Sequence, residues 1–160
     1  MKHSAFNQAF MKLFTLITLC FIAFGFTGNL GLDTYEVYLN DKLILKHSVN
    51  QPLSLRTLQL DKATADDQLR IIYTHCMVKG AGTDRSLAIK NEKGTMLKKW
   101  DFANASGSNL SMTIPVKELL KIEKANADHD LRLYYAAREL PKGEMLALIQ
   151  TDQKSIAGNK

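Results

Sequence analysis

The sequence predicts an all-β domain, an antiparallel β-sandwich of roughly seven to nine strands with one short helix near residues 115–125. From residue 34 onward, short apolar runs are bounded by Gly, Pro, Asn and Asp, as in strands joined by tight turns. Helical spacing of apolar residues is found only after Pro115. The roughly 130 residues that follow an apolar leader are enough for one hydrophobic core and not for two, so we expect a single domain over 29–150.

The first two predicted strands, residues 34–39 and 42–49, should form a hairpin. They are joined by Asn40 and Asp41, residue types that tolerate the positive φ of a two-residue turn. Apolar and polar residues alternate along the first strand, which predicts that only one of its faces is covered. The residues on the covered face are Tyr35, Val37 and Leu39.

The next two predicted strands, residues 53–60 and 68–78, differ in pattern. Apolar residues in 53–60 alternate and then change phase, which predicts a β-bulge near Arg56 and Thr57, with a short helix as the alternative. The segment 68–78 carries apolar side chains on both faces, which is typical of a central strand.

The second half of the chain predicts five more strands and the helix. Gly94 supplies the positive φ of a second hairpin tip, Pro115 ends a strand and begins the helix, and residues 141–143 read as a turn. The last ten residues, 151–160, are expected to be a flexible tail. The five strands are 85–91, 95–102, 109–114, 131–138 and 144–150.

A short pattern in the late strand resembles a feature of immunoglobulin-like sandwiches. Asp130 and Tyr134 follow a helical connection with the spacing of the corner that precedes a late strand in that family. The resemblance covers about five residues, and Ala136 stands where the family has a cysteine. It implies an immunoglobulin-like architecture and no ligand.

The N-terminus has the three parts of a secretory signal peptide. Lys2 and Lys12 precede an almost wholly apolar run over 13–26, small residues follow it, and Asp33 is the first acid. We expect cleavage between residues 26 and 29, which makes 1–28 the signal and places the domain in the periplasm or outside the cell.

Three other interpretations of the N-terminus remain open. The uncharged interval 13–32 is 20 residues long, about the ~20 needed for an N-terminal membrane anchor. Cys20 would mark a lipoprotein, although it lies in the middle of the apolar run rather than at its end. Met11 is an alternative start of the chain.

Cysteine content narrows the cellular context. Cys76 is the only cysteine after the leader, so no intramolecular disulfide can form in the exported domain. A small exported domain without disulfides is more typical of a bacterial envelope than of a eukaryotic secretory pathway. Removing residues 1–28 leaves a net charge of +3, a mild value that gives no reason to expect nucleic acid as a partner.

Two groups of residues are candidate ligand-binding sites. Lys98 and Trp100 combine a cation with an aromatic ring, which suits an anionic polymer or a sugar, although a lone Trp on a strand is also typical of core packing. A histidine flanked by acids suits an oriented imidazole or a cation site, although the same residues are common in turns. These residues are Asp128, His129 and Asp130. We predict no catalytic residue, metal site or cofactor, because His47, His75, His129 and Cys76 lack the spacing of metal ligands.

The resulting functional prediction is an exported, non-enzymatic domain that binds an envelope protein, a glycan or another surface component. One alternative is an exported hydrolase that uses scattered carboxylates or a site centred on His129, without a G-x-S-x-G nucleophile turn. A second alternative is an assembly subunit in which the edge of the first hairpin pairs with another chain. The sequence does not determine the oligomeric state.

Overall fold

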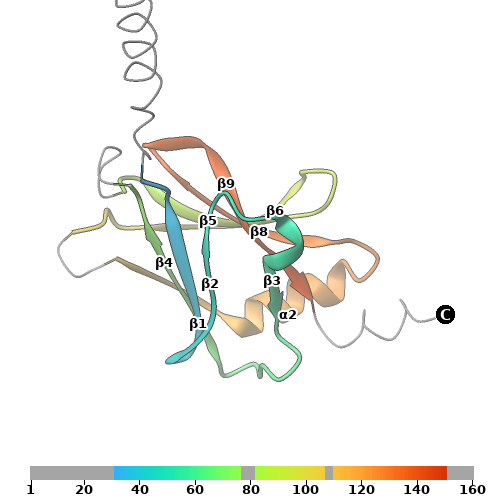
Figure 1. Ribbon diagram of the computed structural model, residues 1–160. Helices are drawn as coiled ribbons and strands as arrows, with labels where there is room; N and C mark the ends of the chain where they lie inside the picture. Colours follow the sequence, from blue (N-terminus) through green and yellow to red (C-terminus); the bar gives the residue numbers. More distant parts are fainter. Residues whose placement is uncertain (1–30, 77–81, 107–109, 151–160) are drawn as a thin grey trace, which may run out of the picture. The chain divides into compact units, whose positions relative to one another are not determined.

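The computed structural model describes residues 31–76, 82–106 and 110–150, which form a β-sandwich of two sheets (Figure 1). The predicted leader over 1–28 and tail over 151–160 lie outside these residues. The first sheet consists of β2 (Lys42–Ser48), β1 (Thr34–Leu39), β4 (Gln68–Thr74) and β7 (Ser111–Pro115), in that order. The second consists of β3 (Thr57–Gln59), β9 (Leu140–Gln150), β8 (Leu131–Ala137), β5 (Arg85–Lys90) and β6 (Met96–Phe102). The predicted all-β fold is confirmed.

Strand pairing follows the turn chemistry of the sequence. The predicted hairpins β1–β2 and β5–β6 are both present, with positive φ angles of 53° at Asn40 and 81° at Gly94. β4 pairs on both sides, with β1 and β7, so its predicted central position is confirmed. The predicted helix is α2 (Val116–Ala125), which follows β7 without a break.

The core lies between the two sheets because alternate residues of each strand point to the same side. Tyr35 and Val37 of β1 are buried, as the alternation in that strand predicts. On the second sheet, alternation along β8 buries one face and leaves Tyr134 on the outer face, so the tyrosine of the immunoglobulin-like pattern does not enter the core. The largest buried side chains on the inner faces include Leu69, Ile71, Met112, Leu87, Ile89 and Leu133.

Two predicted segments differ from the structure. Residues 53–60 contain a 3-10 helix, η1 (Leu53–Leu55), followed by β3, so one helical turn rather than a bulge shifts the apolar phase. β9 begins at Leu140 and passes through the predicted turn at 141–143, with a register shift against β8. Gly143 permits this with φ of +70°, and a side chain there would place its Cβ 3.0 Å from the Tyr135 carbonyl oxygen.

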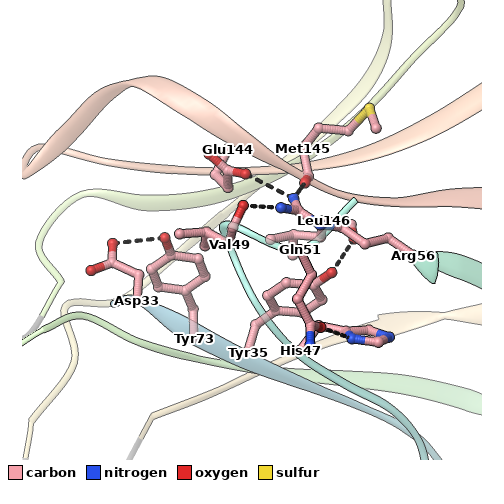
Figure 2. Close-up of polar contacts among 10 residues, drawn as sticks. All are labelled: Asp33, Tyr35, His47, Val49, Gln51, Arg56, Tyr73, Glu144, Met145 and Leu146. Carbon is pink, nitrogen blue, oxygen red and sulfur yellow. Dashed lines mark hydrogen bonds and ion pairs between the residues drawn. The ribbon is translucent and has the colours of Figure 1, made fainter. Parts of the chain in front are cut away.

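A buried arginine holds the segment in which the chain passes from the first sheet to the second (Figure 2). Arg56, only 3% exposed, donates to the carbonyl of Val49, just after β2, and at 2.9 Å to the Met145 carbonyl of β9. A carboxylate oxygen of Glu144 lies 2.9 Å from the same guanidinium. The Arg56 carbonyl also accepts the Leu148 amide, which aligns β3 with β9 as a parallel pair.

A tyrosine makes a second polar link between the sheets. The Tyr35 hydroxyl of β1 donates to the Leu146 carbonyl of β9, as Figure 2 shows. A buried hydroxyl that finds such a partner avoids the cost of an unsatisfied polar group, roughly 1–3 kcal/mol. Hydrogen bonds as well as apolar contacts therefore join the two sheets.

We expect Arg56→Met to lower the free energy of unfolding by about 3 kcal/mol or more, because it leaves two carbonyls and a carboxylate without their donor. Urea denaturation of the purified protein measures the change. Arg138→Met is the matched control, since Arg138 also pairs with an acid, Asp84, but is 73% exposed and should contribute little. Equal stability of the two variants would contradict the structural role given to Arg56.

Candidate functional site

The structure brings the predicted pair Lys98 and Trp100 together on β6, next to helix α2. The Trp100 indole donates to a carboxylate oxygen of Glu118 at 2.9 Å, and the Lys98 ammonium lies 3.5 Å from the same oxygen. Lys98 is also 5.8 Å from the centre of the Trp100 ring. Trp100 packs against the core, so this pair attaches α2 to the edge of the second sheet.

The predicted group Asp128, His129 and Asp130 follows α2, and its acidic partner is elsewhere in the sequence. A carboxylate oxygen of Glu92, in the β5–β6 turn, lies 2.8 Å from His129 Nδ1, and the other accepts the Asp130 amide at 3.2 Å. Backbone hydrogen bonding and the His129 contact hold the pKa of the Glu92 carboxyl below its usual range. Asp128 is exposed. These contacts join two turns of the fold.

A polar cluster that sequence reasoning missed lies around Asp33, at the start of β1. Asp33 is 1% exposed, and its carboxylate accepts the Tyr73 hydroxyl at 2.8 Å and the Cys76 amide at 2.9 Å. His75, whose side chain is fully buried, has Nδ1 3.7 Å from the same carboxylate and Nε2 hydrogen-bonded to Tyr135 at 2.8 Å. The cluster therefore links the first sheet to β8.

The rings of this cluster also stack across the sandwich. Tyr73 of β4 and Tyr135 of β8 lie with ring centres 4.0 Å apart and planes inclined by 17°. Gly82 closes over them, since a Cβ at that residue would lie 3.0 Å from the Tyr135 hydroxyl and 3.3 Å from His75 Nε2. Because Asp33 and His75 are buried, we assign the cluster a structural role. Its only sequence signal is that Asp33 is the first acid of the chain.

Neighbouring Arg85 is a further buried cation, and it is held by main-chain acceptors. Its guanidinium donates to the carbonyls of Ala103 at 2.8 Å and Leu110 at 2.7 Å. These bonds fix the segment after β6 and the segment before β7. Arg85 thus acts within the scaffold and not at the surface.

A shallow pocket of about 160 Å³ lies on the outer face of the second sheet. Its floor is made of small side chains, Ser86 and Ala88 of β5 and Ala136 of β8, which are neighbours across the two strands. Tyr134 lines the pocket beside this floor. We call the pocket, with the lysines that line it, the basic groove; the lysines are Lys90, Lys99 and Lys142.

The charge of the basic groove is largely uncompensated. Lys99 pairs with Asp101 at 2.6 Å, whereas Lys90 and Lys142 contact no acid in the described part of the chain. The Lys90 ammonium lies 4.4 Å from the centre of the Tyr134 ring, a cation–π contact that holds the charge beside the pocket. Arg132 is directly opposite Lys90 across β8 and β5, which places a fourth cation next to the groove.

The sequence contained part of the signal for this groove. Alternation along β6 places Lys99 on the face opposite to Lys98 and Trp100, and alternation along β8 places Tyr134 outside. The only Trp lies on the Lys98 face, so its position in the sequence favours that face instead. Lys142 was not predictable as a groove residue, because it comes from the irregular start of β9, where the sequence predicts a turn.

The residues that the structure describes offer no metal centre. Within 31–76, 82–106 and 110–150, no three His, Cys, Asp or Glu side chains are placed so that they could hold an ion. In the same ranges, no helix is both long and apolar enough to span a bilayer. Cys76 falls within the segment 68–78 that was predicted to be one strand, but it is half-buried and lies beyond the end of β4.

We expect the free energy of unfolding to fall as the pH rises above about 10, where tyrosines of the unfolded chain ionise. Burial raises the pKa of Tyr35 to about 12 and that of Tyr135 to about 12. Between these two pH values the unfolded chain loses protons that the folded chain keeps, so rising pH favours unfolding. Urea denaturation across this range measures the loss.

Near-ultraviolet absorbance of tyrosinate provides the direct check. The native protein should show fewer than its five tyrosines ionised near pH 11, while the same protein in urea should show all five. Full ionisation of the native protein at the pH of the unfolded control would contradict the burial of these hydroxyls.

Comparison with known proteins adds no assignment to this geometry. No family model matches the chain, and neither a curated protein nor a solved structure matches it.

Proposed function

We propose that this protein is exported and binds a component of the cell envelope through the basic groove, without catalysing a reaction. The observation that carries the proposal is the uncompensated charge on the outer face of the second sheet. Lys90 and Lys142 contact no acid in the described residues, although 16 acidic side chains are present in the chain. Cations left without acids on a concave surface provide a favourable potential for an anionic partner.

The strand pairing strengthens this argument. Lys90 and Arg132 are direct cross-strand neighbours of the same charge, an arrangement that destabilises a sheet. The small floor residues Ser86 and Ala88 leave the pocket between the lysines open rather than filled by side chains. A face with these two properties is better suited to binding an anion than to stabilising the fold.

The leader supports the location of the partner. Residues 1–28 have the composition of an export signal, which would bring the domain into contact with the cell envelope rather than with nucleic acid. Three carboxylates that a hydrolase could use are engaged in separate contacts, since Glu118 binds Trp100, Glu92 binds His129 and Glu139 binds Thr83. These contacts favour a binding role.

The test uses the full chain with its own leader, expressed in a bacterial host that exports proteins. We expect a processed protein that sediments with the envelope at low salt and is released at high salt, because salt screens exposed charges. Replacing three groove lysines by glutamine should shift most of the protein to the soluble exported fraction. The substitutions are Lys90→Gln, Lys99→Gln and Lys142→Gln.

The control is a triple variant on the exposed face of α2 with the same change of charge. Its substitutions, Lys117→Gln, Lys121→Gln and Lys124→Gln, should leave envelope binding unchanged. Unprocessed protein in the cytosol would refute export. Undiminished envelope binding by the groove variant would refute binding through the groove.

A further inference from the structure

We infer that the ligand of the basic groove is an acidic sugar unit of a glycan, a single ring that carries a carboxylate. This inference rests on the proposed envelope-binding function and specifies its ligand. It depends on the size of the pocket, its place within the sheet and the side chains that line it.

The size of the pocket limits what can enter it. At about 160 Å³ the pocket is roughly half the smallest volume typical of sites that enclose a drug-sized molecule, about 300 Å³. One ring or head group fits such a volume, while the rest of a larger ligand would lie outside it. A polymer of small repeating units meets this requirement, because each unit can be bound in turn.

The position of the pocket within the sheet argues against an extended peptide. The floor belongs to β5 and β8, which are interior strands with hydrogen-bonded neighbours on both sides. A peptide that adds to a sheet needs the unpaired backbone of an edge strand. Recognition in this groove must therefore come from side chains.

The side chains suit a ring that is apolar on one face and charged at its edge. Tyr134 offers aromatic surface beside the alanine floor, and aromatic side chains with a polar tip favour such amphipathic partners. The Ser86 hydroxyl can exchange hydrogen bonds with sugar hydroxyls. Lys90, Lys99 and Lys142 come from three different strands and place ammonium groups around the pocket for a carboxylate.

The test measures binding of the processed protein to a short oligogalacturonate by titration calorimetry at low salt. We expect binding to the oligogalacturonate and none to its methyl ester, which keeps the rings and removes the charge. Lys99→Gln should weaken binding roughly two- to fivefold, which is the usual loss of affinity when one exposed charge contact is removed. Lys98→Gln is the matched control on the opposite face of β6, also loses one ion pair, and should bind like the wild type.

Trp100 provides an independent readout of which face is used. It is the only Trp of the chain and lies with Lys98 on the side of β6 that contacts α2. Its fluorescence emission should stay unchanged at saturating oligogalacturonate. A shift in emission together with loss of binding in Lys98→Gln would refute the groove as the site.

Three further probes separate sugar from other anions. Equal or tighter binding of polyglutamate, inorganic polyphosphate or phosphatidylglycerol vesicles would refute the sugar and identify an acidic peptide, a phosphate polymer or a lipid surface instead. If envelope binding depends on the groove lysines but oligogalacturonate does not bind, the sugar inference fails and the envelope-binding function stands. If envelope binding does not depend on them, that function fails as well.

Discussion

The fold depends on one buried arginine at the point where the chain leaves one sheet and enters the other. Burying a guanidinium costs free energy that its hydrogen bonds must offset, and here two carbonyls and one carboxylate accept from its two terminal nitrogens, while Nε has no hydrogen-bond partner in the described residues. The backbone of Arg56 simultaneously accepts the Leu148 amide, so the same residue sets the position of β3 against β9. With β9 fixed, β8 and β5 follow by antiparallel pairing, and the outer face that carries the basic groove is defined.

Tyrosines extend this arrangement through the core. Tyr35, Tyr73 and Tyr135 each bury a ring between the sheets and place the hydroxyl against a different acceptor or partner, Leu146, Asp33 and His75. A ring provides apolar area while its hydroxyl demands one particular neighbour, so these residues both stabilise the sandwich and specify how the sheets face each other. In the described residues, where Cys76 is the only cysteine, these contacts cross-link the sandwich without a disulfide.

Local patterns in the sequence were sufficient to predict the strands, turns and helix. They were insufficient to predict which distant residues contact each other. Alternation identified β1 and its buried face, Asn40 and Gly94 identified two hairpins, and Pro115 located α2. The parallel β3–β9 pair could not be predicted, because it joins segments about 90 residues apart through a buried arginine. The sequence predicts only part of the candidate site. Alternation along β6 places Lys99 and Lys98 on opposite faces, but only the fold shows that Glu118 contacts the Lys98 face. A lysine without an acid can be recognised only when its neighbours are known.

The hydrogen bond between the first strand and the last one also constrains the order of folding. Tyr35 and its acceptor Leu146 are 111 residues apart in the sequence, and the stacked residues Tyr73 and Tyr135 are some 60 residues apart. Contacts of such long range are slow to form, because the loop between them must close before the contact stabilises it. The core of this domain can therefore be completed only after synthesis has passed β9, so the nascent chain remains without its complete core until that point.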